Sequence, residues 1–166
     1  ESTSLDFEGE IALIIGKAGR RIKPADAMSH VAGFSIYNDG SVRDYQRQTS
    51  QFTPGKNFAN TGGFGPWMMT MDEIGDLDAM EITTRLNGTV MQNATSDLLV
   101  HGFAEILEYC STFVELKPGD VLVTGTPGGV GAARKPPVFM DEGDLIEVEV
   151  KPIGTLSNPV VAEVAS

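Results

Sequence analysis

The chain of 166 residues is long enough for one domain with its own hydrophobic core, and it carries a net charge of −11. This acidic balance argues against nucleic-acid binding, which needs a basic patch, and no apolar run approaches the ~18 residues that cross a bilayer. A single cysteine, Cys110, excludes an intrachain disulfide and fits a reducing compartment. With no visible signal peptide, we expect a cytoplasmic protein.

The first half of the chain predicts two strands, two short helical segments and one long loop. Residues 10–16 are an apolar run ended by glycine, and residues 33–39 form a second such run. Between them, residues 23–33 predict a short helix, with Pro24 in its first turn and Gly33 as its C-terminal cap. The next segments are a helical turn capped by Ser41, over residues 41–46, and a polar loop over residues 47–66 that is rich in glycine and proline. Loops of that length are often functional.

The second half predicts one hairpin, the main helix and two further strands. Asn87–Gly88 lies between β-rich runs in residues 80–92, which is a type I′ hairpin signal. Residues 95–110 predict the main helix, capped by Thr95 or Ser96, because apolar residues recur there at helical spacing. Residues 117–129 predict a turn, a strand and a glycine-rich loop, and residues 142–154 a turn and an alternating strand. The expected fold is α+β and mainly β, as a single domain over residues 1–166.

Two glutamates stand at the head of the first strand. Residues i and i+2 of a strand project from one face, so Glu8 and Glu10 bring two carboxylates together. A hard divalent cation would relieve their repulsion. Spacing alone favours a solvent-exposed strand start instead, because Glu147 and Glu149 repeat the same pattern in what reads as an ordinary wet face.

Three other segments hold candidate ligands, although taken alone each is better explained as a turn or a solvated surface. In "YNDGSVRDYQ", Asp39 ends a strand, and Arg43 and Gln46 follow at i+4 and i+7. Lys56 stands in the long loop, in "PGKNF". The loop "VTGTPGGVG" could bring backbone N–H groups and the hydroxyl of Thr124 or Thr126 to a ligand, but it lacks the ending of a P-loop.

Taken in order, these segments resemble the C-terminal catalytic domain of the fumarylacetoacetate hydrolase family. The motifs that carry the resemblance are "FEGE", "AMSHVAGF", "NDGSVRDYQ", "GKNF", "GPWM", "NGTVMQ" and "GDVLVTGTPGGVG". Together they cover about residues 5 to 155. The resemblance implies a mixed β-sandwich roll with one main helix, and it replaces the separate explanations of each motif by a single site.

The resemblance also implies what each candidate residue does. Glu8, Glu10 and Asp39 would hold Mg²⁺ or Mn²⁺, with Ca²⁺ as an alternative occupant in crystals. Lys56 would be catalytic. The substrate-binding residues would be Arg43, Gln46 and Thr126. Open positions on such a metal suit a 2-keto acid that chelates through its carboxylate and keto oxygens.

Several reactions could use such a site. We expect hydrolytic C–C cleavage of an acylpyruvate-type substrate; the alternatives are a decarboxylase or an isomerase/tautomerase of the same family, acting on an oxaloacetate-like or 2-hydroxy-dienoate substrate. A non-catalytic metal-binding β-domain is a further alternative. Many members place a His and Glu pair in a lid segment upstream of the glutamate strand, and the seven residues before Glu8 hold no such pair. We expect either that the lid segment is missing from this chain, which starts at Glu1 rather than Met, or that water is activated differently. The general base is therefore unassigned, since neither His30 nor His101 matches the family position. Family likeness further implies a homodimer.

Overall fold

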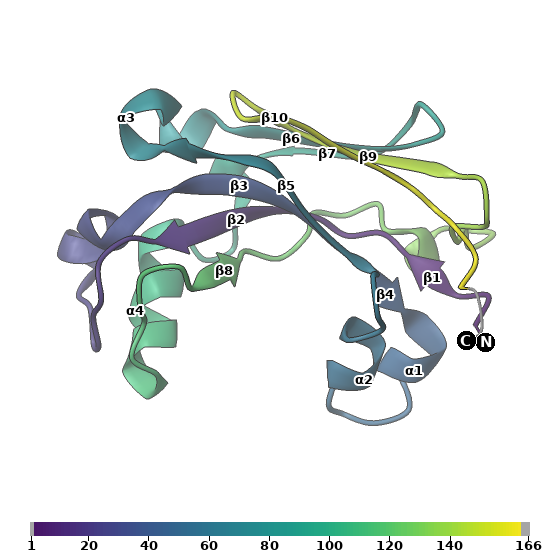
Figure 1. Cartoon of the computed structure of the whole chain (residues 1–166), viewed down its shortest axis with the longest axis horizontal. Helices are drawn as coiled ribbons and strands as arrows, with labels where there is room; N and C mark the ends of the chain where they lie inside the picture. The colour runs from purple at the N-terminus through teal and green to yellow at the C-terminus, as the bar shows by residue number, and fades with distance from the viewer. Residues whose placement is uncertain (1, 164–166) are drawn as a thin grey trace.

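Two four-stranded antiparallel sheets, packed face to face, make up most of the protein in this computed structural model, which describes residues 2–163 (Figure 1). The first sheet has the order β5-β3-β2-β8, with bounds Gly62–Thr70, Val31–Asp39, Gly9–Ile15 and Val121–Val123. The second has the order β10-β9-β6-β7, with bounds Gly154–Pro159, Leu145–Lys151, Glu81–Leu86 and Thr89–Thr95. A short pair, β1 (Leu5–Asp6) with β4 (Ser41–Val42), extends beside the first sheet. The mainly-β α+β expectation is confirmed.

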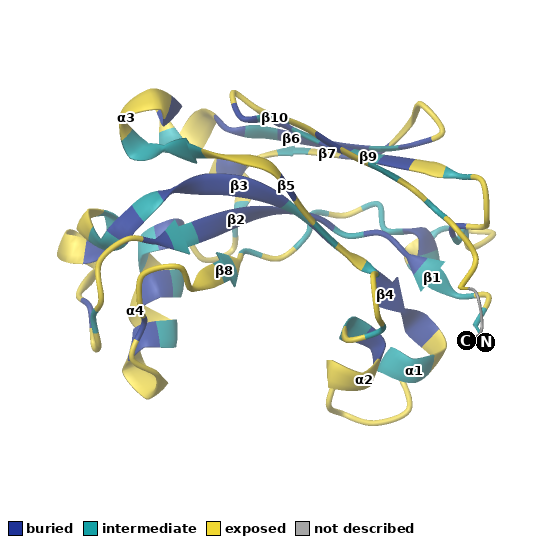
Figure 2. Cartoon of the chain, viewed as in Figure 1, coloured by how far each residue is buried: buried dark blue, intermediate teal, exposed yellow. Residues whose placement is uncertain are grey.

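The core lies between the two sheets, and burial alternates from residue to residue along β9, as expected for a sandwich strand with one face in solvent. Figure 2 shows the buried residues concentrated in β2 and β3, which are the central strands of the first sheet. On the facing sheet, Ile146, Val148 and Val150 of β9 point inward while Glu147 and Glu149 are half-exposed. This confirms the wet face expected for the second glutamate pair.

The helices are short and peripheral. The main helix is α4 (Phe103–Phe113), which packs against the 3₁₀ helix Pro24–His30. The small helices α1 (Arg43–Gln46) and α2 (Thr53–Lys56) pack against each other next to β4, on the side away from the second sheet (Figure 1). A further turn, α3 (Met71–Ile74), follows β5. Among residues 2–163, no helix is long and apolar enough to cross a membrane.

Three predicted boundaries in the first half were wrong. The helix expected over 23–33 ends at His30, and Gly33 is a strand residue, because Val31 pairs with Ile15 across the sheet. Ser41 does not cap α1; it belongs to β4, and its hydroxyl donates to the carbonyl of Asp39. The loop expected over 47–66 holds α2, and β5 begins within it at Gly62.

The main helix begins later than the sequence predicts. Residues 96–98 form a separate 3₁₀ turn, and neither Thr95 nor Ser96 caps α4. The helix starts after Gly102, whose N–H donates to the carboxylate of Glu105 at 3.2 Å. The other predicted strands are confirmed, and so is the hairpin, in which Asn87 and Gly88 both adopt positive φ between β6 and β7.

Candidate metal centre

The pairing of β2 with β3 gathers three carboxylates on one face of the first sheet. Glu10 lies opposite Tyr37, and the N–H of Asp39 donates to the carbonyl of Glu8 at 2.8 Å. Residues paired across antiparallel strands share a face, so Asp39 stands beside Glu8 just as Tyr37 stands beside Glu10. One carboxylate oxygen of each of Glu8, Glu10 and Asp39 lies within 4.8 Å of the others, and these residues could hold a metal ion.

The glycine between the two glutamates allows β2 to approach the second sheet closely. Gly9 faces Thr84 of β6, and a Cβ at position 9 would overlap the Thr84 hydroxyl and touch a methyl of Val148 at 3.0 Å. Glu8 and Glu10 point to the other face of the strand, away from this contact. The pattern Glu-Gly-Glu is therefore set by packing on one face and by the carboxylate cluster on the other.

Glu10 is the most deeply buried member of the cluster, with 3 % of its surface exposed. The pKa of its carboxyl is raised from 4.5 to about 7: burial and the nearby charges of Asp39 and Glu8 raise it, and a hydrogen bond from the Gly125 N–H opposes them. That N–H lies 2.8 Å from Glu10 Oε2. Gly125 has φ of 86°, a conformation that favours glycine. A buried carboxylate of this kind is stabilised by a cation.

Lys56 places its ammonium group among the carboxylates. Its Nζ lies 2.9 Å from Glu8 Oε2 and 2.5 Å from Asp39 Oδ2. Burial alone would lower the pKa of Lys56, but the hydrogen bonds to Asp39 and Glu8 hold it above its usual value. The residue is presented by α2, where Gly55 packs directly on the backbone of Gln46 in α1.

Arg43 joins the cluster to a fourth, fully buried carboxylate that the sequence reasoning missed. Arg43 Nη1 lies 2.6 Å from Glu8 Oε1 and donates to Gln46 Oε1 at 2.9 Å, while its Nε donates to Asp6 Oδ2 at 2.8 Å. Asp6 also accepts the backbone N–H groups of Phe7, Gly131 and Ala132. Asp6 precedes Glu8 by two residues, which is the same spacing that separates Glu8 from Glu10.

The glycine-rich loop after β8 closes the cluster from another side. Thr126 Oγ1 donates to the carbonyl of Gly9 at 2.9 Å and accepts from Gln92 Nε2 at 2.7 Å. The structure thus brings together six of the seven residues predicted to form the site, namely Glu8, Glu10, Asp39, Arg43, Gln46 and Lys56. The seventh, Thr126, reaches this group through the carbonyl of Gly9, which lies between the two glutamates. Their individual roles stay predictions.

The charges of the cluster fit a divalent cation. Two cations, Arg43 and Lys56, form ion pairs with three carboxylates, those of Asp6, Glu8 and Asp39. Glu10 adds a fourth carboxylate beside them, so two negative charges are uncompensated when all four are ionised. Carboxylate oxygens are the ligands that Mg²⁺ and Mn²⁺ favour. The donor set, its burial and its charge therefore all suit such an ion.

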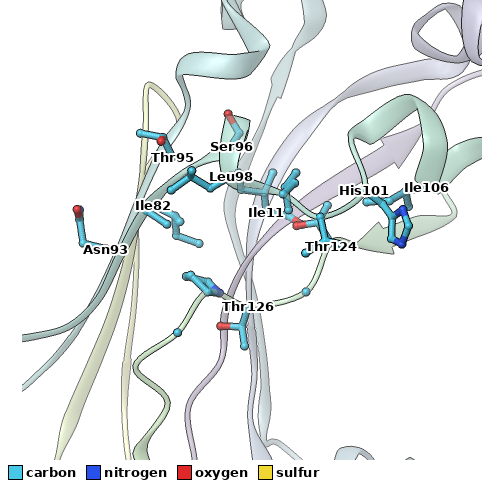
Figure 3. A pocket seen from close by; sticks show the side chains of 16 residues that line it. Ile11, Ile82, Asn93, Thr95, Ser96, Leu98, His101, Ile106, Thr124 and Thr126 are labelled. Carbon is cyan, nitrogen blue, oxygen red and sulfur yellow. The ribbon is translucent and has the colours of Figure 1, made fainter.

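Two cavities flank the cluster. One, of about 510 Å³, has Asp39 and Lys56 in its wall; its other lining residues are Tyr37, Asn57, Phe64, Val121 and Val123. The second, of about 670 Å³, has Ile11 of the first sheet and Ile82 of the second in its wall, together with the loop that carries Thr124 and Thr126 (Figure 3).

Neither histidine belongs to the cluster. His101 lies at the edge of the larger cavity, next to Ile106, and pairs with Glu105. His30 contacts the carbonyl of Lys17 through its Nδ1.

Comparison with known proteins agrees with this geometry. Residues 1–161 match the family model described as fumarylacetoacetate (FAA) hydrolase, C-terminal. The chain belongs to this family. The expected resemblance is therefore confirmed, and it extends over almost the whole chain.

Relatives of this chain carry different activities in their names. The mitochondrial oxaloacetate tautomerase FAHD2A of Bos taurus is 44% identical over 163 residues, which cover 97% of this chain and 52% of the relative. The oxaloacetate tautomerase YisK of Bacillus subtilis is 39% identical over 159 residues, covering 96% and 53%. A solved structure of a fumarylacetoacetate hydrolase from Exiguobacterium antarcticum is 41% identical with a TM-score of 0.94, covering 98% of this chain and 58% of that one. The chain thus spans about half the length of the curated relatives it matches.

Proposed function

We propose that the chain carries the metal-dependent active site of a 2-keto acid tautomerase, with oxaloacetate as the model substrate. The observation that carries the proposal is the cluster of the Glu8, Glu10 and Asp39 carboxylates. In the proposed reaction this cluster binds Mg²⁺ or Mn²⁺. Support for the reaction comes from two relatives named as oxaloacetate tautomerases, one mammalian and one bacterial. These names favour the tautomerase alternative over the C–C hydrolase that the sequence analysis placed first.

The residues around the cluster suit a small dicarboxylic acid. A bound divalent cation would act as a Lewis acid toward a keto oxygen. Lys56 offers an ammonium group in the wall of the 510 Å³ cavity, where it would pair with a substrate carboxylate. Arg43 keeps one buried nitrogen, Nη2, without a hydrogen-bond partner among the residues that the structure describes. That nitrogen is a spare donor for a second acceptor.

The rest of this cavity's wall is largely apolar. Phe64, Val121 and Val123 line it beside Lys56, each with 40 % or more of its surface exposed. A substrate bound against them would cover this apolar surface, and the loss of water there would strengthen the attraction between Lys56 and an anionic group.

The decisive experiment follows the ultraviolet absorbance of the oxaloacetate enol as it converts to the keto form. We expect conversion above the uncatalysed rate that requires Mn²⁺ or Mg²⁺ and falls at least a hundredfold in Glu10→Gln. The matched control is Glu147→Gln, which removes a glutamate of β9 outside the cluster and should leave the rate unchanged.

Parallel assays separate the competing functions. Cleavage of an acylpyruvate without tautomerisation would restore the hydrolase interpretation, and decarboxylation of oxaloacetate without tautomerisation would support a decarboxylase. Binding of Mn²⁺ with none of these reactions would identify a non-catalytic metal-binding domain.

A further inference from the structure

One amide side chain, Gln92 of β7, links the backbone of β2 to the glycine-rich loop. It is almost fully buried, with 1 % of its surface exposed. We propose that Gln92 is a positioning residue that holds the carboxylate cluster in the shape needed for metal binding, although it touches neither the metal ligands nor the substrate cavity. This inference rests on the proposed function, because it assigns Gln92 a task at the same site.

The contacts of Gln92 form a closed hydrogen-bond ring around a single glycine. Gln92 Oε1 accepts from the N–H of Gly9 at 3.1 Å, and Nε2 donates to Thr126 Oγ1 at 2.7 Å. Thr126 Oγ1 in turn donates to the carbonyl of Gly9 at 2.9 Å. The second N–H of Nε2 donates to the carbonyl of Pro127 at 2.8 Å. Both backbone groups of Gly9 and both ends of the amide are satisfied.

The ring requires an amide. Gln92 must accept at one atom and donate twice at the other, and a carboxylate at this position could only accept. A flipped amide would place its NH₂ group against the N–H of Gly9, so the network fixes the orientation of the side chain. A methionine would fill the same space but make none of these hydrogen bonds.

Through this ring, Gln92 controls the backbone on two sides of one carboxylate. Gly9 lies between Glu8 and Glu10, and Gly125, which donates to Glu10 Oε2, directly precedes Thr126. Movement of either segment would change the separation of the carboxylate oxygens. Groups that orient metal ligands in this way commonly alter metal affinity by roughly 10- to 100-fold when they are removed.

Hydrogen bonds also hold the two ends of this loop: Thr124 donates to the carbonyl of Ile11 through its N–H at 3.2 Å and its Oγ1 at 3.0 Å, and Arg134 Nε donates to the carbonyl of Gly129 at 3.0 Å. On the far side from the cluster, residues 124–128 line the 670 Å³ cavity, in which the side chains of Thr124 and Thr126 lie opposite Ile82 (Figure 3). A Cβ built on Gly125 or Gly128 would meet no atom within 4 Å. Hydrogen bonds therefore position this loop, since it is not packed from both sides.

The test compares two substitutions of Gln92 with a control on the same strand. Gln92→Met removes every hydrogen bond at similar volume, and Gln92→Glu removes only the donors. The control is Asn93→Met, because the Asn93 amide is exposed and bonds instead to Glu81 and Thr83. Isothermal titration with Mn²⁺ measures metal affinity, and hydrogen–deuterium exchange of the metal-free chain measures the protection of residues 123–131.

Both substitutions of Gln92 should weaken Mn²⁺ binding by roughly 10- to 100-fold and speed deuterium uptake in the loop at least tenfold, with Asn93→Met within twofold of wild type on both. Affinity and uptake within twofold of wild type in Gln92→Met would overturn the inference. Should that variant not fold, Gln92→Glu and Thr126→Val, which removes the centre of the ring, decide by the same two measurements.

The two proposals fail in different ways. A wild-type chain that binds Mn²⁺ but does not tautomerise oxaloacetate refutes the proposed reaction, while the affinity comparison still decides the role of Gln92. A wild-type chain that binds no metal refutes the metal centre and, with it, the proposed task of Gln92. Unchanged affinity in the Gln92 variants of an active, metal-binding chain refutes the positioning role alone.

Discussion

Replacing Glu10 by glutamine should make the metal-free protein more stable at alkaline pH and remove its response to metal. The folded-state pKa of Glu10 is raised from 4.5 to about 7 by burial first and by the charges of Asp39 and Glu8 second. Each unit of difference between the folded and unfolded pKa corresponds to about 1.36 kcal/mol. Ionising the Glu10 side chain in the folded protein therefore costs roughly 3 kcal/mol.

The direction of the pH dependence follows from the raised value. Without metal, the contribution of Glu10 to stability is fully present below pH 4.5 and is lost as the pH rises through 7. A glutamine keeps the shape and can still accept from the Gly125 N–H, but it does not ionise. The stability difference between Glu10→Gln and wild type should therefore grow by about 3 kcal/mol between pH 4.5 and pH 8.

Metal should offset most of this difference between the two proteins. Free Mn²⁺ at one hundred times its dissociation constant stabilises a folded protein by about 2.7 kcal/mol, and only wild type should gain this. Urea unfolding at pH 5, 6, 7 and 8, with either EDTA or Mn²⁺, measures both effects, with Glu147→Gln as the control. A stability difference that does not change with pH in EDTA would refute the account of the buried carboxylate. Equal stabilisation of both proteins by Mn²⁺ would remove Glu10 from the metal site.

Three further substitutions test the surroundings of the cluster. Gly9→Ala should cost roughly 1–3 kcal/mol in urea unfolding, because its new methyl meets β6, whereas Gly128→Ala, with no atom near its Cβ, should cost less. Asp6→Asn should cost about 3–5 kcal/mol in the same assay by leaving Arg43 in a broken buried pair; a loss below 1 kcal/mol would mean that the backbone N–H bonds at this position suffice. Lys56→Met should lower kcat/KM for oxaloacetate by roughly 10- to 150-fold, the equivalent of about 1.5–3 kcal/mol for a charged hydrogen bond, without weakening Mn²⁺ binding. Weaker Mn²⁺ binding in that variant would instead assign Lys56 to the support of the metal ligands.

Much of the fold could be predicted from local patterns. The Asn87–Gly88 turn and the alternation of residues 145–150 specify their strands through backbone preference and a two-residue period, and both are confirmed. The helix ends could not be predicted in this way, because tertiary contacts decide them. Val31 joins a strand through its pairing with Ile15, although the preceding residues carry the signals of a helix.

The residues of the site likewise fall into those that the sequence could identify and those that it could not. Strand spacing alone favours a solvent-exposed position for Glu8 and Glu10, and the ordered family motifs are needed to assign them to one site with Asp39. The structure explains this assignment, since β2 and β3 are neighbours in the sheet. Asp6 and Gln92 could not be assigned a role, because each acts through a partner far away in the chain. Asp6 meets Arg43 after 37 residues, and Gln92 meets Gly9 after 83.

Close approach of backbones explains why the remote partners are needed. Gly9 lets β2 approach β6 so closely that its N–H and carbonyl are reached by side chains from β7 and from the loop after β8. A bulkier residue at position 9 would separate these elements and open the ring around it. The glutamates on either side would then keep their spacing along the strand but lose the fixed position of the Gly125 N–H. The geometry of the carboxylate cluster therefore depends on a residue that has no side chain to offer it.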